Sequence, residues 1–127
     1  SQVRESLNRM SVEQLQSKLL SWVRHKKLPE VSHALHRGVD IEARDEHGNT
    51  ALIVAAQNGH TALVKMLVDK GADVGAVNGK RNTPLHYAVA YDFKEIADML
   101  LLAGADEYIQ NTNGLTPYEG LEPGSVG

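Results

Sequence analysis

The chain of 127 residues contains no cysteine, which excludes disulfide bonds, thiolate zinc sites and cysteine nucleophiles. We therefore expect an intracellular protein, located in the cytoplasm or the nucleus, where disulfides are rare. Aromatic residues account for only 5% of the chain, whereas 42% is hydrophobic. Its core must therefore be built mainly from aliphatic side chains.

A basic excess is also missing, since 13 Lys and Arg stand against 16 Asp and Glu for a net charge of −3. This balance argues against nucleic-acid binding, which needs a basic face. No apolar run approaches the roughly 20 residues that span a bilayer. The opening SQVRESLNRMSVEQ lacks both an apolar secretory signal and an initiator Met. We expect neither nucleic-acid nor membrane binding, and a trimmed piece of a longer protein fits this opening.

Catalytic motifs are absent as well. The sequence has no GxSxG motif and no glycine-rich phosphate loop of the Walker or Rossmann type. GKRNT lacks the GK[ST] ending of a phosphate loop, and no predicted strand precedes it. We therefore predict a protein that is not an enzyme and that uses no cofactor.

An internal repeat organises the chain. Gly38, Gly71 and Gly104 are spaced by 33 residues, and residues 45–77 align without a gap on residues 78–110. Such a fixed period is typical of solenoid proteins. The paired identities are Asn49/Asn82, Thr50/Thr83, Leu52/Leu85, Ala55/Ala88, Met66/Met99, Leu67/Leu100, Gly71/Gly104, Ala72/Ala105 and Asp73/Asp106.

Each repeat unit predicts two helices and a loop. The segments 49–59 and 82–92 favour short helices, and 60–71 and 92–104 carry wide apolar stripes at helical spacing. Pro84 suits a first helical turn, and Asp92 with Glu95 predicts a capping box for the second helix. Gly71 and Gly104 suit left-handed helix ends. The segment 72–82, rich in Gly and Asn, predicts a projecting loop.

These segments resemble ankyrin repeats, whose signature is a Thr-Pro-Leu-His opening and a Gly-Ala-Asp close. The resemblance covers roughly residues 12–121 and is specific over 45–110. It implies an all-α solenoid of stacked helix-turn-helix pairs with projecting β-hairpin-like finger loops. Residues 1–127 would form one ankyrin-repeat domain, divided into an extension (1–11), a divergent capping repeat (12–44), two repeats (45–77 and 78–110) and a partial repeat with a tail (111–127).

The first unit departs from the pattern, with Trp22 and Lys26 where the family has small residues. Ser11 and Gln14 resemble a capping box, and Pro29 suits the start of a second helix. We expect the preceding segment to form a short helix that covers the open end of the solenoid, with an apolar face of Val3, Leu7 and Met10.

The six histidines raise the question of a metal site. His33 and His36 share one face of a predicted helix, but a third ligand is not evident, so we predict a solvated face and no metal. The resemblance implies that His86 hydrogen-bonds to backbone and joins adjacent repeats, a link that Ile53 cannot make in the preceding repeat. His60 is predicted to be structural, at the start of a helix.

The predicted loops differ in charge. The first finger, RDEHGN at 44–49, is acidic, and the second, NGKRN at 78–82, is basic. Neighbouring fingers of opposite charge favour a partner with complementary charge. Arg81 stands where Gly48 and Gly114 predict a glycine, so we expect slight backbone strain there.

The turn YDF at 91–93 replaces NGH of the preceding repeat, which puts two aromatic residues beside the groove that ankyrin repeats use for contacts. These side chains either fill a gap in the structure or serve as exposed anchors for a partner. We favour the second interpretation for Tyr91, and less strongly for Phe93.

The sequence thus predicts a non-catalytic protein–protein interaction module that is monomeric in isolation and binds an unidentified partner protein through its fingers and concave inner helices. Two alternatives stay open: a regulatory or targeting segment of a larger multidomain protein, with an enzyme among the candidates, and a self-assembly element that pairs through Val3, Leu7 and Met10. The predicted contact residues are Glu46, His47, Asn49, Gln57, Asn58, Lys80, Arg81, Asn82, Tyr91 and Phe93.

Overall fold

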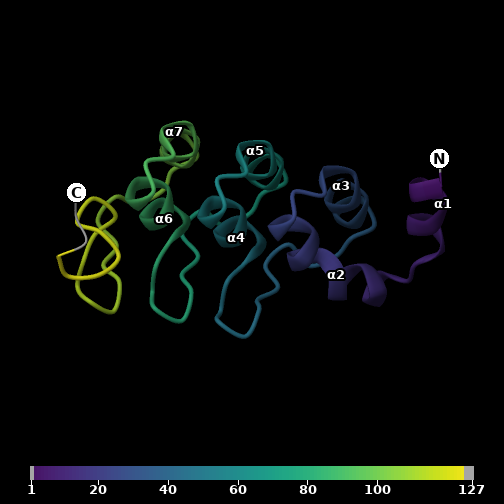
Figure 1. Cartoon of the computed structure of the whole chain (residues 1–127), viewed down its shortest axis with the longest axis horizontal. Coiled ribbons are helices and arrows are strands. Elements are labelled where there is room, and N and C mark those ends of the chain that lie inside the picture. Colours follow the sequence, from purple (N-terminus) through teal and green to yellow (C-terminus); the bar gives the residue numbers. More distant parts are fainter. Residues whose placement is uncertain (1, 125–127) are drawn as a thin grey trace.

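The computed structural model describes residues 2–124, which form a row of helices with loops projecting from one side (Figure 1). The described residues contain no strand, so the predicted all-α class is confirmed. The helices are α1 (Gln2–Arg9), α2 (Val12–Arg24), α3 (Leu28–His36), α4 (Ala51–Gln57), α5 (Thr61–Asp69), α6 (Pro84–Ala90) and α7 (Lys94–Leu102).

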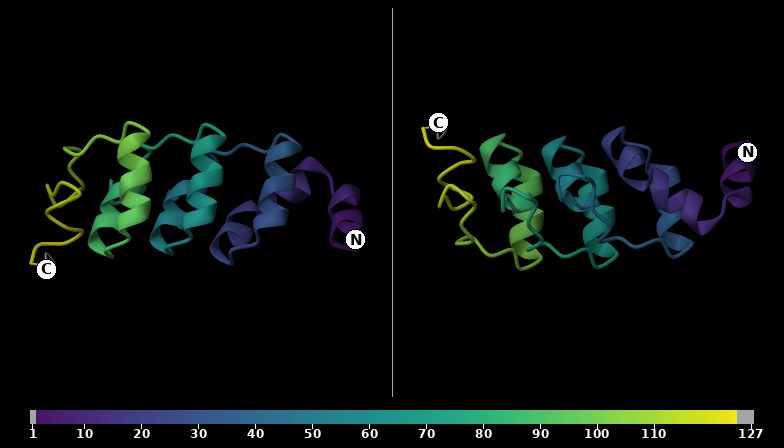
Figure 2. Two further views of the ribbon diagram at one scale, coloured as in Figure 1. Left: turned by 90° about the horizontal axis from the view of Figure 1, so that it is seen from above. Right: turned by 90° about the horizontal axis from the view of Figure 1, so that it is seen from below.

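The helices are arranged as three stacked pairs. Inner helices α2, α4 and α6 pair with outer helices α3, α5 and α7, and α4 packs against α2, α5 and α6. The outer helices lie side by side along the row when seen from above (Figure 2). On the opposite side, the fingers descend beside the inner helices (Figure 1). This arrangement creates a surface between the fingers and the inner helices.

The helix starts follow from local chemistry. Thr50 caps α4 by accepting a hydrogen bond at Oγ1 from the backbone N–H of Ile53, at 3.3 Å. Thr83 caps α6 in the same way with His86 N–H at 3.2 Å, and Pro84 follows in the first turn as predicted. Such caps satisfy N–H groups that have no partner inside the helix.

The turns between helices use left-handed backbone. Gly71 and Gly104 have φ of +89° and +96°, which confirms the prediction for both helix ends. The predicted capping box of Asp92 with Glu95 is wrong. The N-cap of α7 is Phe93, which makes no side-chain capping bond, and Asp92 itself has φ of +59°. It fills the left-handed position that Gly59 takes in the preceding repeat, one residue too early to cap the helix.

The core is an aliphatic layer that runs between the helix rows, as the composition predicts. Equivalent residues of successive repeats stack in it, such as Leu52 and Leu85, which are 1% and 0% exposed. Because each pair buries its stripe only against its neighbours, the stack is needed for stability. Its largest fully buried aliphatic members are Leu15, Leu19, Leu52, Ile53, Leu63, Leu67, Leu85, Ile96 and Leu100.

The N-terminal end is covered by α1. Leu7 is buried, Met10 packs against the core, and only Val3 of the predicted apolar face is substantially exposed. Most of the face proposed for self-assembly is therefore used within the chain. The capping box of Ser11 and Gln14 is confirmed, with bonds of 3.1 and 2.8 Å between each side chain and the other's N–H.

At the other end, residues 111–115 form a third finger, in which Asn111 N–H donates to the carbonyl of Leu115 at 2.9 Å. In the described part of the chain, no helix follows α7. Leu102, on the outer face of α7, is 90% exposed.

Candidate functional site

The three fingers begin with the same device. Oδ1 of Asn78 accepts hydrogen bonds from the N–H groups of Lys80 and Asn82, both at 3.1 Å. Asp45 and Asn111 lie 33 residues before and after Asn78. The Oδ1 atom of each likewise accepts hydrogen bonds from the N–H groups two and four residues further along the chain. Short Asp and Asn side chains are suited to this, because they reach backbone N–H groups close by in sequence. The tight turn of each finger is thereby fixed.

Side-chain amides also join neighbouring fingers. Nδ2 of Asn78 donates to Oδ1 of Asn49 at 2.9 Å, and Nδ2 of Asn111 donates to Oδ1 of Asn82 at 2.9 Å. Nδ2 of Asn78 also donates to the hydroxyl of Tyr87 on α6, at 2.8 Å. All five of these residues are buried. The fingers are therefore tied to one another and to the inner helix behind them.

Backbone bonds reinforce this row. The N–H of Gly79 donates to the carbonyl of His47 at 2.9 Å, and the N–H of Thr112 donates to that of Lys80 at 3.0 Å. The guanidinium of Arg44 adds a bond of 2.6 Å to the carbonyl of Val77. The finger tips are thus held in register, like the short edges of a sheet.

Two of the predicted contact residues, Asn49 and Asn82, belong to this framework. They are 7% and 3% exposed, and their side-chain oxygens already accept the amide bonds between fingers. A partner would have to compete with those bonds for the side-chain oxygens of both residues. We therefore replace their predicted role as contact residues with one in positioning the fingers. Their register with Asp45, Asn78 and Asn111 was visible in the sequence as a 33-residue period.

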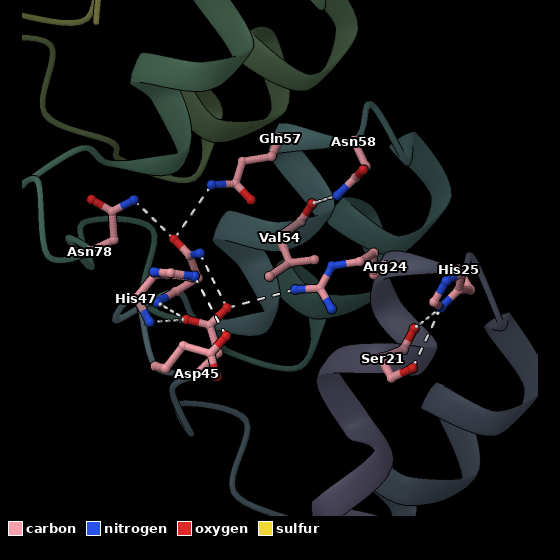
Figure 3. A network of polar contacts seen from close by, with 11 residues as sticks. Ser21, Arg24, His25, Asp45, His47, Val54, Gln57, Asn58 and Asn78 are labelled. Atoms are coloured by element: carbon pink, nitrogen blue, oxygen red, sulfur yellow. Dashed lines mark hydrogen bonds and ion pairs between the residues drawn. The ribbon is translucent and has the colours of Figure 1, made fainter.

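Asp45 connects the first finger to α2, a link that the sequence did not predict. Its carboxylate lies 3.7 Å from the guanidinium of Arg24 (Figure 3). It also accepts a bond of 3.2 Å from the amide of Asn49. Burial acts to raise the pKa of Asp45, but hydrogen bonds from the N–H groups of Asn49 and His47 outweigh it and hold that pKa below its ordinary value. The folded state therefore favours the ionised carboxylate of Asp45.

Gln57 and Asn58 lie at the end of α4. Nε2 of Gln57 donates weakly to Oδ1 of Asn49, at 3.4 Å, and Gln57 is half-buried. Asn58 is exposed, and its amide donates to the carbonyl of Val54 at 2.7 Å (Figure 3). The structure thus leaves them available as contact residues, which stays a prediction.

A row of three aromatic rings begins in α6 and continues into the turn after it. The ring of Tyr91 lies 6.1 Å from that of Tyr87 and 5.9 Å, edge to face, from that of Phe93. Tyr87 is buried and Tyr91 is 49% exposed. Phe93 is half-buried against the preceding repeat, where a Cβ placed on Gly59 would lie 2.9 Å from its Cζ. Phe93 therefore fills a gap between repeats, while Tyr91 presents an oriented aromatic surface.

Two hollows flank the second finger. The one toward the first finger has a volume of about 470 Å³, and the one toward the third finger about 430 Å³. Lys80 and Tyr87 border both hollows. Glu46, His47 and Gln57 also line the first, and Tyr91 lines the second. Seven of the ten predicted contact residues border these hollows. The three that do not are Asn58, Arg81 and Phe93.

The finger tips carry opposite charges. Glu46 and His47 are exposed and lie 3.5 Å apart between Oε1 and Nε2. Lys80 and Arg81 are exposed, and within residues 2–124 neither side chain makes a hydrogen bond or an ion pair. Arg81 has φ of +61°, which confirms the left-handed backbone expected there.

His86 joins two repeats, as the resemblance implied. Its Nδ1 accepts from the N–H of Thr83 at 3.1 Å, and its Nε2 donates to the carbonyl of Leu115 at 2.8 Å. Burial lowers the pKa of His86, and the bond to Leu115 opposes this only in part. The equivalent Ile53 is buried by packing alone. His60 is also structural: its Nε2 reaches the carbonyl of Arg24 at 2.9 Å, linking α5 to α2.

Residues 2–124 contain no group of three or more His, Cys, Asp or Glu placed to hold a metal ion, so His33 and His36 have no third ligand there. None of the helices described is both long and apolar enough to cross a membrane.

Comparison with known proteins identifies the repeat. A family model described as ankyrin repeats, in three copies, matches residues 19–112. The chain is 31% identical over 113 residues to the E3 ubiquitin-protein ligase Ufd4 of Drosophila melanogaster, which covers 88% of this chain and 4% of that protein. It is 36% identical over 93 residues to ankyrin repeat and SOCS box protein 16 of Mus musculus, covering 67% and 20%.

A third relative is the human NAD-capped RNA hydrolase NUDT12, 43% identical over 63 residues, which covers 50% of this chain and 14% of that protein. The chain thus spans between 4% and 20% of the length of these three relatives. The family match extends over all three pairs of helices from Leu19 onward and over the fingers up to Thr112. This chain belongs to the ankyrin repeat family, whose repeats are protein-interaction modules.

Proposed function

We propose that this chain is a non-catalytic module that binds a partner protein through the concave surface formed by its fingers and by α4 and α6. The observation that carries the proposal is Tyr91, which is 49% exposed yet oriented by rings on both sides. A fixed, exposed aromatic ring loses little conformational freedom on binding and is a typical interface anchor. Tyr91 lines the hollow toward the third finger together with Lys80.

The proposed surface has eight residues after Asn49 and Asn82 are assigned to the framework. Its exposed members differ between the fingers, so the surface has a polarity along the row. The residues are Glu46, His47, Gln57, Asn58, Lys80, Arg81, Tyr91 and Phe93.

The test is capture of proteins from cell lysate by three forms of the chain. The first is the natural sequence, and the second carries Lys80→Glu, Arg81→Glu and Tyr91→Ala. The third is a matched control with the same change in charge and one apolar truncation on the outer helices: Lys65→Glu, Lys70→Glu and Leu102→Ala. All substituted side chains of the control are exposed on α5, its end, or α7. Circular dichroism verifies that all three forms are folded.

We expect to find proteins that the natural chain and the control capture but that the second form, called the concave variant, does not. Proteins lost only by the control would place the surface on the outer helices. Capture of nothing by any folded form would contradict the proposal.

A second candidate is that the module regulates or targets a larger multidomain protein. The observation that favours it is that relatives named as a ubiquitin ligase and an RNA hydrolase contain a matching segment amid much longer chains. Sequencing the full transcript tests this candidate, since a further catalytic domain would support it. The expected location in the cytoplasm or nucleus stays a prediction, which imaging of the tagged protein would test.

A further inference from the structure

The second finger carries a charge pattern that its neighbours lack. At its tip, Lys80 and Arg81 occupy the positions that His47 and Gly48 take in the first finger and Asn113 and Gly114 in the third. Both cations are exposed and, in the part of the chain described, unpaired. The whole chain has a net charge of −3, so this basic tip is a local exception.

Acidic groups flank this tip on both sides. Glu46 borders the hollow toward the first finger, and Glu122 borders the hollow toward the third. A partner that is acidic throughout would meet repulsion at both flanks, whereas a short acidic stretch would meet cations at its centre. The surface thus fits a partner whose negative charge is confined to a few residues.

The backbone geometry of Arg81 gives a second, independent indication that the finger tip has a function. Arg81 has φ of +61°, while Gly48 and Gly114 occupy the equivalent left-handed positions with φ of +79° and +74°. A side chain at such a position costs stability that glycine would not. Strained residues of this kind are often retained where the side chain has a function. Here the side chain at the left-handed position is exposed at the finger tip.

An aromatic ring lies next to one of the cations. Lys80 and Tyr91 line the same hollow of about 430 Å³, which Tyr87 also lines. The ring of Tyr91 is held in place by its two aromatic neighbours. An aliphatic side chain next to a carboxylate could therefore contact this ring while the carboxylate reaches the finger tip.

We propose that the second finger and Tyr91 bind an extended peptide segment of the partner in which one or two carboxylates lie next to an aliphatic side chain. The carboxylates pair with Lys80 and Arg81, and the aliphatic side chain packs on Tyr91. This inference rests on the proposed function, because it names the chemistry that the concave surface recognises.

The test uses three peptides that differ only in charge: acetyl-GLEELG-amide, acetyl-GLQQLG-amide and acetyl-GLKKLG-amide. Each is titrated into the isotopically labelled chain, and amide signals are followed by NMR. We expect the acidic peptide to shift the signals of Lys80, Arg81 and Tyr91 and to bind at least about tenfold more tightly than its glutamine version at low salt. Raising the ionic strength should remove most of this preference, because exposed charges are screened.

A charge reversal makes the test sharper. The variant Lys80→Glu/Arg81→Glu should lose the acidic peptide and gain preference for the lysine peptide. The matched control Lys65→Glu/Lys70→Glu has the same net charge but keeps the finger tip, and it should behave as the natural chain does. Tyr91→Ala should weaken the binding of all three peptides, whatever their charge, because each contains leucine.

Equal affinity for the acidic and glutamine peptides would overturn the inference, as would equal loss in the control variant. Failure of this inference differs from failure of the proposed function. If no peptide shifts the concave signals but the lysate partner is still lost by the triple concave variant, the acidic segment is wrong and the binding surface stands. If the concave variant also captures the lysate proteins as well as the natural chain does, both this inference and the proposed function fail.

Discussion

The side-chain amide of Asn78 donates a hydrogen bond to Oδ1 of Asn49 at 2.9 Å, and Asn111 repeats the bond with Asn82 33 residues later. Each donor also fixes its own finger through its side-chain oxygen. One side chain therefore shapes a finger and ties it to the finger before it. These bonds fix the fingers that border the concave surface. Binding at a fixed surface costs less conformational entropy than binding at flexible loops.

Asn78→Ala should destabilise the chain more than any exposed finger substitution. It removes bonds to Asn49, Tyr87 and two backbone N–H groups, and leaves buried polar groups unpaired. We expect the free energy of unfolding to fall by about 2–4 kcal/mol, measured by urea denaturation. Thr112→Ala is the control, because its side chain is exposed on the third finger, and it should cost less than about 0.5 kcal/mol. Equal losses would show that the amide network is not structural.

Gly48→Ala should cost more stability than Gly114→Ala. Both glycines have left-handed backbone, so each substitution introduces strain of about 1 kcal/mol. A Cβ on Gly48 would also lie 2.9 Å from the backbone nitrogen of Gly79, whereas one on Gly114 would meet nothing within 4 Å. We expect a further loss of about 1–3 kcal/mol for Gly48→Ala in thermal or urea unfolding. The difference measures the contact between fingers, and its absence would mean that the fingers separate freely.

Arg81→Gly should stabilise the chain while weakening acidic-peptide binding. Glycine relieves about 1 kcal/mol of left-handed strain, and the greater freedom of the unfolded chain offsets about half of it. A net gain of about 0.5 kcal/mol is expected by urea denaturation. Lys80→Gly removes a neighbouring charge from a residue without left-handed backbone, so it should give no gain. A loss of stability in Arg81→Gly would contradict the strain argument.

Stability should fall as the pH drops through the titration of His86. Its pKa in the folded chain lies below the ordinary value of 6.5, because burial disfavours the charged ring. A second ring proton, on Nδ1, would also break the hydrogen bond that this nitrogen accepts from the N–H of Thr83. The neutral ring therefore stabilises the fold fully above pH 6.5, and this contribution is lost as the pH falls from there to the folded pKa.

The measurement is the melting temperature across this range for the natural chain and for His86→Ile, which copies Ile53 of the preceding repeat. The variant should be less stable at neutral pH, where the bonds to Thr83 and Leu115 are lost. Its melting temperature should depend less on pH than that of the natural chain. Parallel curves for the two proteins would assign the pH dependence to other groups, such as Asp45, whose contribution is lost only at more acidic pH.

Local patterns predicted the helices well because their causes are local. The capping box at Ser11, the position of Pro84 and the left-handed Gly71 each depend on residues within a few positions. The same reasoning failed at Asp92, where a capping motif and a left-handed turn compete for one residue. The 33-residue register decided for the turn, because the stack requires every helix pair to turn at the same place.

By itself, the sequence determined the repeat, the helix pairs, the aliphatic core and the opposite charges of the finger tips, since all follow from spacing and residue type. Only the tertiary structure decided which polar residues face solvent. Asn49 and Asn82 are buried because an amide from the next finger meets each of them, while Phe93 takes the space above Gly59 and the neighbouring ring of Tyr91 stays exposed. Burial depends on contacts between residues far apart along the chain, and residue type alone does not show which of them meet.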